Sequence, residues 1–197
     1  MRIIAGEFRS RRLKTLRGPS LRPTSDRLRE TLFDVLGDTV AGSIWLDCYA
    51  GSGAVGLEAL SRGAAQVIFL EQGRASARIL RENIAALGVA DRTRVLETSV
   101  AQGLGRLAAS WKNQGLRTAF VFLDPPYRQE AECQRALLLL ASLDLVTPST
   151  LVIAEHARRA PPPATCGRLV RIRLVEQGDS ALSFYRGEEP YRLGRLA

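Results

Sequence analysis

The segment Asp47-Cys48-Tyr49-Ala50-Gly51-Ser52-Gly53-Ala54-Val55-Gly56 decides the fold of this chain. It follows the apolar run 43–47, which has the length of a buried strand, and it leads into residues 52–61, which have helical character. A strand, a glycine-rich turn and a helix in this order form the first unit of many α/β folds that bind nucleotides. Glu71 lies 18 residues after Gly53, close to the spacing of an acid that binds ribose hydroxyls.

Strand and helix patterns alternate on both sides of this glycine segment. Seven strands are expected, at 43–47, 66–71, 93–96, 119–123, 150–155, 168–176 and 181–186. Helices are expected at 25–36, 52–61, 74–87, 101–112 and 130–143. The alternation predicts a Rossmann-like α/β fold with a mostly parallel, seven-stranded sheet and helices on both faces. Ligands of such sheets bind beyond the carboxyl ends of the strands, so the residues after each strand are the candidates for a functional site.

Positive charge is concentrated at the N-terminus. The 197 residues carry a net charge of +8, and residues 1–30, with nine basic and three acidic side chains, account for +6 of it. We expect a basic N-terminal hairpin or arm at 1–20, with a turn near Gly6, followed by a single globular unit at 21–197. Such a concentration of arginine is typical of proteins that bind nucleic acid.

The cysteine, histidine and hydropathy patterns argue against several classes of protein. The three cysteines are widely spaced and His156 is the only histidine, so no metal site is expected. We interpret the thiols as reduced, which favours an intracellular, cytoplasmic location. The N-terminal stretch lacks the apolar core of a signal peptide, and no apolar run approaches the length of a membrane span.

Asp47 distinguishes two cofactor classes that use a glycine loop of this kind. A dinucleotide places its pyrophosphate against the N-terminus of the helix. A carboxylate at the end of the first strand would repel that pyrophosphate, but it would complement the cationic methionine part of S-adenosylmethionine. Glu71 would accept hydrogen bonds from ribose hydroxyls in either class. A nicotinamide-dependent oxidoreductase remains an alternative, although it needs a catalytic proton donor that this chain barely supplies.

The tetrapeptide Asp124-Pro125-Pro126-Tyr127 follows the fourth predicted strand and is the most specific feature of the chain. Two consecutive prolines fix two φ angles and remove two N–H donors. The Asp124 carboxylate and the Pro125 carbonyl would then accept both N–H groups of an aromatic amine and expose its lone pair to a methyl donor. Tyr127 offers a face on which the base can stack. Much of the acceleration would come from alignment of nitrogen, methyl and sulfur.

These motifs resemble those of the RsmD-type 16S rRNA (guanine-N2) methyltransferases. Amino-methyltransferases share a DxxxGxG loop followed by an (N/D)PP(Y/F/W) tetrapeptide, as found here. The closer resemblance is carried by MRIIAG at 1–6, RRLK at 11–14, RPTSDRLRE at 22–30, LEALSRGA at 57–64 and GDS at 178–180. It extends from Met1 to about Arg186, nearly the whole chain.

The resemblance implies an S-adenosylmethionine-dependent methyltransferase fold and methylation of one guanine of 16S rRNA. The substrate would be the 30S subunit or an assembly intermediate, and the enzyme a monomer. The implied cofactor-binding residues are Asp47, Ala50, Gly51, Gly53, Glu71, Gln72 and Ser99, the last standing where many relatives have Asp or Asn. The implied catalytic residues are Asp124, Pro125 and Tyr127. The implied RNA-binding residues are Arg9, Arg11, Arg12, Lys14, Arg22, Thr24 and Arg27.

Three alternatives stay open from the sequence. Another amino-methyltransferase could act on adenine N6, on cytosine N4 or on the side-chain amide of glutamine. The chain is too short for a separate DNA-recognition domain, and a glutamine enzyme would not need so basic an N-terminus. A nicotinamide-dependent dehydrogenase would bind NAD instead. A catalytically inactive RNA-binding module would bind RNA with a steep salt dependence and transfer no methyl group.

Overall fold

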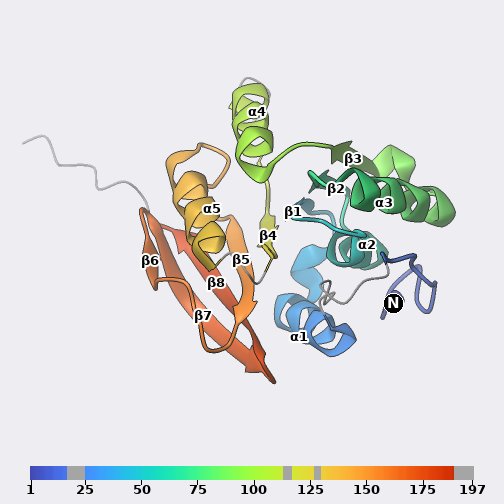
Figure 1. Ribbon diagram of the computed structural model, residues 1–197, viewed down its shortest axis with the longest axis horizontal. Coiled ribbons are helices and arrows are strands. Elements are labelled where there is room, and N and C mark those ends of the chain that lie inside the picture. Colours follow the sequence, from blue (N-terminus) through green and yellow to red (C-terminus); the bar gives the residue numbers. More distant parts are fainter. Residues whose placement is uncertain (17–24, 113–116, 127–129, 189–197) are drawn as a thin grey trace, which may run out of the picture.

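The computed structural model describes residues 1–16, 25–112, 117–126 and 130–188, and within these residues one eight-stranded sheet forms the centre of the molecule (Figure 1). The strands are β1 (Ile44–Cys48), β2 (Gln66–Leu70), β3 (Thr93–Leu96), β4 (Phe120–Leu123), β5 (Leu151–Ala157), β6 (Thr165–Cys166), β7 (Leu169–Gln177) and β8 (Ser180–Gly187). Their spatial order is β3-β2-β1-β4-β5-β8-β7-β6. Strands β1 to β5 are parallel, whereas β8, β7 and β6 are joined by antiparallel pairings.

The predicted sheet of seven strands is wrong by one strand. The additional strand, β6, has two residues and pairs antiparallel with β7 across Gly167. Gly167 has φ 59°, the left-handed conformation that glycine adopts at little cost and that a tight turn needs here. Two residues cannot display the alternation of apolar and polar side chains by which a strand is recognised, so β6 becomes visible only through its pairing.

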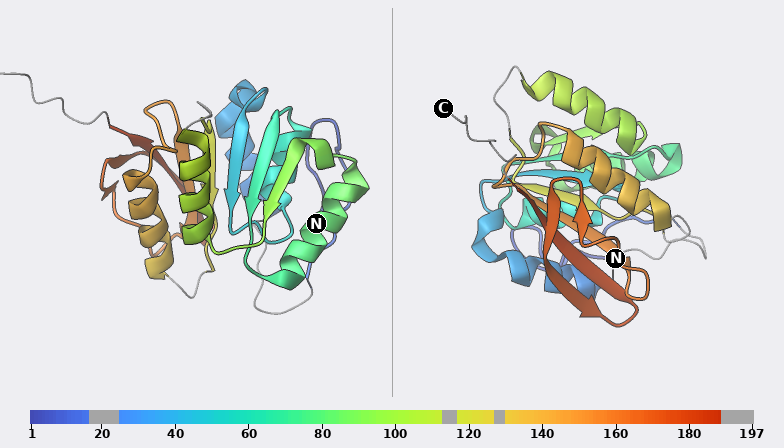
Figure 2. Two further views of the ribbon diagram at one scale, coloured as in Figure 1. Left: turned by 90° about the horizontal axis from the view of Figure 1, so that it is seen from above. Right: turned by 90° about the vertical axis from the view of Figure 1, so that its left-hand side faces the viewer.

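The helices cover both faces of the sheet, as expected. They are α1 (Asp26–Leu36), α2 (Ala54–Ser61), α3 (Arg74–Leu87), α4 (Val100–Lys112) and α5 (Glu130–Ser142), with short 3₁₀ helices η1 (Gly37–Val40) and η2 (Ala90–Arg92). One apolar core contains side chains of α1, α2 and α3, and a second contains side chains of α4 and α5. Figure 2, right, shows α4 and α5 on one side of the sheet and α1 on the other. Neighbouring residues of β1 divide between the cores, Trp45 facing the first and Leu46 the second.

The N-terminal segment packs against the domain. Ile3 and Leu13 are buried in the first core. Arg2 and Arg12 form one isolated antiparallel bridge, and no regular two-stranded hairpin occurs among residues 1–16. Residues 17–24, which contain the expected boundary between arm and domain, lie outside the described residues.

Four backbone N–H groups of this segment bind to residues of α2, while others pair within the segment on either side of the Arg2–Arg12 bridge. The carboxylate of Glu58 accepts the N–H groups of Ile4 and Ala5 at 2.8 and 3.0 Å. The N–H groups of Glu7 and Phe8 bind the carbonyl and the hydroxyl of Ser61 at 2.8 and 2.9 Å. The predicted arm is therefore held along α2 by polar contacts as well as by apolar burial.

Arg29 connects the N-terminal segment, α1 and α2. Its side chain is fully buried, and Nη2 donates to the carbonyl of Arg2 at 2.7 Å and to Asp26 at 2.9 Å. Its Nε lies 3.8 Å from the buried carboxylate of Glu58. Burial lowers the pKa of Arg29, but a guanidinium keeps its charge in proteins, so the buried acid and the backbone acceptor balance it. Part of the RPTSDRLRE motif thus serves to hold the fold together.

Candidate active site

A cavity of about 1280 Å³ lies at the carboxyl ends of the parallel strands. Its lining comes from the loops after β1, β2, β3, β4 and β5, from the turn between β7 and β8, and from the N-terminal segment. Eight of the residues predicted from the sequence line it together: Asp47, Ala50, Gly51, Glu71, Gln72, Ser99, Asp124 and Pro125. The fold therefore brings the predicted cofactor loop and the Asp124-Pro125-Pro126 segment into one cavity.

Asp47 is buried at the end of β1, with 2% of its surface exposed. Its Oδ2 accepts the N–H of Gly56, in the first turn of α2, at 2.9 Å. Burial raises the pKa of Asp47 to about 7, and the nearby Glu71 carboxylate adds to the shift. A desolvated carboxylate of this kind gains most when a cationic group binds beside it.

Glu71 fastens the glycine loop to the end of β2. Its Oε2 accepts the N–H of Gly51 at 2.7 Å, and its Oε1 accepts the N–H of Gly73 at 2.6 Å. Each carboxylate oxygen can accept a second hydrogen bond, so both can still bind ligand hydroxyls. Gly51 has φ 57°, and a Cβ there would meet no atom within 4 Å, which leaves the loop open toward the cavity.

Gly53 lies behind the loop. It is not among the residues that line the cavity, and a Cβ at this position would lie 2.3 Å from Cδ1 of Leu80 on α3. Its φ of 83° also favours glycine. The structure therefore gives Gly53 a packing role between the loop and α3, and its contact with a cofactor stays a prediction.

The acceptor side of the cavity begins where β1 and β4 end. The last residue pair of these strands is Cys48 and Leu123, so Tyr49 and Asp124 are the next residues on adjacent strand ends. Asp124 is half-buried and Pro125 is buried, and both line the cavity. Tyr127, the predicted stacking residue, lies outside the described residues.

Tyr49 and Glu132 also line the cavity, and the sequence motifs did not identify them. Tyr49 has φ 63°, which is uncommon for a residue with a side chain, and its hydroxyl donates to Glu132 at 2.9 Å. Burial raises the pKa of Tyr49 above its usual value, so the phenol keeps its proton and serves as the donor. An aromatic residue within a glycine loop is a sequence signal for Tyr49, but nothing local in α5 distinguishes Glu132.

Ser99 combines a place in the lining with a structural role. It precedes α4, and its Oγ accepts the N–H of Gln102 at 3.4 Å, as an N-cap residue does. The hydroxyl group can also form a hydrogen bond with a ligand. Thr98, its buried neighbour, lines the cavity as well and forms a 3.0 Å hydrogen bond with Gln102.

The described residues among those predicted to bind RNA do not line the cavity. Arg9, Arg11, Arg12, Lys14 and Arg27 are exposed, whereas Arg22 and Thr24 fall outside the described residues. Lys14 forms a 2.8 Å ion pair with Glu82 of α3. With its amide oxygen turned toward α1, Gln177 accepts a hydrogen bond of 2.9 Å from Nε of Arg27. The segment that carries these cations reaches the cavity through Thr15 and Leu16.

The turn after β5 adds two cationic residues to the rim that the sequence motifs did not identify. Arg158 and Arg159 are exposed and line the cavity. Arg158 forms a 3.2 Å ion pair with Glu176 of β7, and its N–H binds the carbonyl of Asp179 at 2.8 Å. His156, nearby on β5, is buried and lies 2.8 Å from the hydroxyl of Ser183, so it belongs to the sheet and not to the lining.

The charges of the lining fit a cationic ligand. Six acidic residues line the cavity, Asp47, Glu71, Asp124, Glu132, Glu176 and Asp179, together with the cationic Arg158 and Arg159. The carboxylates would repel the pyrophosphate of a dinucleotide, whereas they complement the amino group and sulfonium of S-adenosylmethionine.

Among the described residues no group of three or more His, Cys, Asp or Glu side chains could hold a metal ion. Among the residues that the structure describes, the helices are too short or too polar to span a bilayer.

Comparison with known proteins gives four consistent matches. A family model described as conserved hypothetical protein 95 matches residues 1–186. Ribosomal RNA small subunit methyltransferase D of Haemophilus influenzae is 37% identical over 162 residues, which span 82% of this chain and 81% of that protein. The protein of the same name in Escherichia coli (strain K12) is 43% identical over 129 residues, 66% of this chain and 61% of that protein. The solved structure of a hypothetical protein from Thermus thermophilus, 29% identical, has a TM-score of 0.76 and covers 94% of this chain and 99% of that one.

Proposed function

Because this chain belongs to the family described as conserved hypothetical protein 95 and is similar to ribosomal RNA small subunit methyltransferases, we propose that it methylates a guanine N2 of 16S rRNA with S-adenosylmethionine as the donor. The resemblance to RsmD-type methyltransferases that the motifs indicate is thereby confirmed at the level of the family. One observation carries the proposal: the acidic glycine loop and the Asp-Pro-Pro segment line the same cavity.

The cofactor half of the cavity consists of the loops after β1, β2 and β3. S-adenosylmethionine, when bound, supplies an electrophilic methyl group on a positively charged sulfur. Asp47 would attract the cationic methionine part, while Glu71 would accept hydrogen bonds from the ribose hydroxyls. Ala50, Gly51, Gln72 and Ser99 line the same cavity and would contact the rest of the nucleoside.

The acceptor half consists of the residues that follow β4. The Asp124 carboxylate and the Pro125 carbonyl would accept the two N–H groups of the guanine amino group, which leaves the nitrogen lone pair directed at the donor half. When the nitrogen–carbon bond has formed, the nitrogen carries one proton too many, and Asp124 would accept it. Tyr127 would stack on the ring. The residues do the work mainly by holding two reactants in line.

The target guanine must leave its stack to enter the cavity, because the acceptor residues lie at the edge of the sheet. We therefore expect a base that is flipped out or already unpaired in the substrate. The proposed substrate is 16S rRNA within the 30S subunit or an assembly intermediate, methylated in the cytoplasm by a monomer. Light scattering of the purified protein would test whether it is a monomer, because a dimer would have twice the molar mass.

Transfer of a radiolabelled methyl group to purified 30S subunits that lack the modification tests the proposal. We expect the label in N2-methylguanosine at one site. Label in N6-methyladenosine or N4-methylcytidine would support methyl transfer to RNA but refute guanine as the methylated base. No labelled RNA, in a preparation that binds S-adenosylmethionine, would overturn the proposed function.

A further inference from the structure

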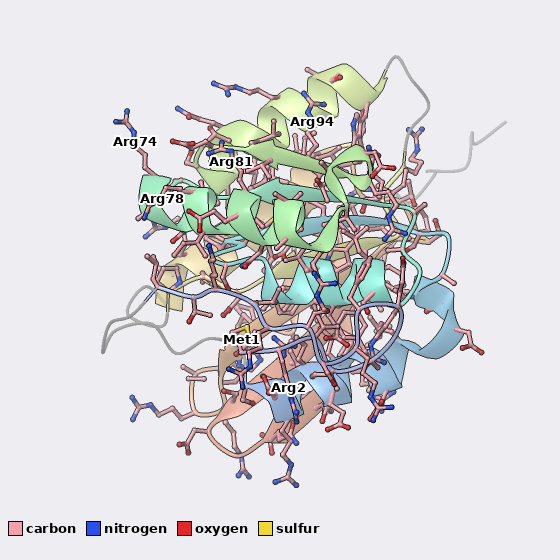
Figure 3. All side chains as sticks on the ribbon, turned by 90° about the vertical axis from the view of Figure 1, so that its right-hand side faces the viewer. Met1, Arg2, Arg74, Arg78, Arg81 and Arg94 are labelled. Carbon is pink, nitrogen blue, oxygen red and sulfur yellow. The ribbon has the colours of Figure 1, made fainter. Side chains whose placement is uncertain are left out.

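Three arginines of α3 form an exposed stripe. Arg74, Arg78 and Arg81 occupy positions i, i+4 and i+7, which lie on one face of a helix. Their side chains are 96%, 76% and 50% exposed, so all three are accessible to a large partner. Arg94 of β3, the edge strand next to α3, is exposed as well. Figure 3 shows all four on one side of the molecule.

The fold adds cations of the N-terminal segment to this stripe. The Nζ of Lys14 lies 2.8 Å from the carboxylate of Glu82, and its backbone N–H donates to Asn83 of α3 at 2.8 Å. The guanidinium of Arg11 donates to the carbonyl of Ala86, near the end of α3. Two cations that lie far from α3 in the sequence therefore join the same surface. We define the α3 basic face as Arg11, Lys14, Arg74, Arg78, Arg81 and Arg94.

The acids that contact this face neutralise only part of its charge. Glu82 is shared by Lys14 and Arg78, at 2.8 and 3.8 Å. Glu97 is shared by Arg74 and Arg81, at 3.9 and 2.9 Å. Six cations thus face two contacting carboxylates in the part of the chain that the structure describes. Exposed ion pairs of this kind are weak, so the guanidinium groups can exchange a carboxylate for a phosphate at little cost.

The α3 basic face extends to the cavity. At the start of α3, Gln72 lines the cavity two residues before Arg74, whereas Ser76 and Ile79 line it from the side of the helix opposite to the three arginines. Thr15 and Leu16, which follow Lys14, line it too. A polyanion lying along α3 and the N-terminal segment would therefore reach the site of methyl transfer.

From this arrangement we propose that the α3 basic face binds the phosphate backbone of the substrate RNA beside the target guanine. The inference rests on the proposed function, because it assigns a surface to the same substrate. The face offers no large apolar side chain for insertion into a lipid bilayer: the exposed large hydrophobics among the described residues, Leu138, Ile172 and Leu174, lie on α5 and β7. Bidentate guanidinium groups suit phosphate oxygens in particular.

The test compares two triple variants with the same loss of charge. The first carries Arg74→Gln, Arg78→Gln and Arg81→Gln. The matched control carries Arg106→Gln, Arg173→Gln and Arg186→Gln, which remove three exposed arginines from α4, β7 and β8. Binding to 30S subunits is measured as a function of salt, together with the affinity for S-adenosylmethionine and the melting temperature, which should stay unchanged in both variants.

We expect the magnitude of the salt slope, d log K/d log [salt], to decrease by about 0.7–0.9 for each phosphate contact removed. The decrease should be about 2–3 in the first variant and much smaller in the control. The KM for 30S subunits should rise at least about tenfold in the first variant, with kcat unchanged at saturating substrate. Equal slopes in the two variants would overturn the assignment of this face. The wild type could also bind RNA without transferring a methyl group while the two variants still differ in slope. That result would support RNA binding by the α3 basic face and refute the proposed reaction.

Discussion

The phenol hydroxyl of Tyr49 donates a 2.9 Å hydrogen bond to the carboxylate of Glu132, although the two residues lie 83 positions apart in the chain. Tyr49 belongs to the glycine loop after β1, and Glu132 to the first turn of α5. The acceptor segment starts beside Tyr49, because β1 and β4 end side by side, and Glu132 follows that segment in the chain. The bond therefore ties the donor half of the cavity to the chain segment that presents Asp124.

Replacing Tyr49 with phenylalanine should remove this bond and keep the packing of the ring. We expect the free energy of unfolding to fall by about 1–2 kcal/mol, because a hydrogen bond to a charged group is lost. Glu132→Ala should cost a similar amount, and the double variant little more than either single one. Glu132→Gln should cost less, since its amide oxygen can still accept. Strictly additive losses in urea unfolding would show that the two side chains do not cooperate.

Asp47→Asn should stabilise the ligand-free protein above neutral pH. The pKa of Asp47 is raised to about 7 in the folded state from an ordinary value of 3.8, so ionisation favours the unfolded chain. This destabilisation of the wild type is fully present above the folded pKa and shrinks as the pH falls toward the ordinary value. The melting temperature of the variant should exceed that of the wild type at about pH 8, and the two should converge by about pH 4.

The same carboxylate should make cofactor affinity depend on pH. The wild type should bind S-adenosylmethionine more tightly as the pH rises through about 7, because the anionic form complements the cationic ligand. Calorimetric titration at several pH values would measure this, with Asp47→Asn as the control that should bind weakly at every pH. An affinity of the wild type that falls with rising pH would contradict the assigned role.

Asp124→Ala should remove methyl transfer and leave binding of 30S subunits nearly intact. Asp124 is expected to accept both an N–H hydrogen bond and the released proton, so its loss should lower kcat by at least about 100-fold. Single-turnover transfer of labelled methyl separates this effect from substrate binding. Near-normal turnover in the variant would refute the placement of the amine at Asp124.

Gly6→Ala should loosen the N-terminal segment from α2. Gly6 has φ 80°, and a Cβ would lie 1.9 Å from the carbonyl oxygen of Ser61, which cannot move aside easily. Gly42 has a similar φ of 72° and nothing within 4 Å of its Cβ position, so Gly42→Ala is a control for backbone strain alone. We expect Gly6→Ala to cost at least about 2 kcal/mol more in unfolding free energy than the control, because overpacking adds to the strain. Equal losses would mean that the close contact with α2 contributes nothing.

Local patterns were sufficient to predict the order of the elements and much of the site. Strand β3 and helix α3 occur at the predicted residues 93–96 and 74–87, because their periodicity and end signals are strong. Asp47, Glu71 and Asp124 could be identified because each lies at the carboxyl end of a parallel strand, and such strand ends meet at one edge of the sheet. The family resemblance drawn from the motifs was likewise available without coordinates.

What the sequence by itself determined, then, is the alternation of strands and helices, the glycine loop and the acceptor tetrapeptide, since each depends on residues that are neighbours in the chain. Only the tertiary structure decided which distant residues meet. The strand β6, the contact between Tyr49 and Glu132, the packing role of Gly53 against Leu80 and the joining of Lys14 to the arginines of α3 all depend on contacts between separate elements. Periodicity reports which face of an element is buried, but only packing determines which other element covers that face.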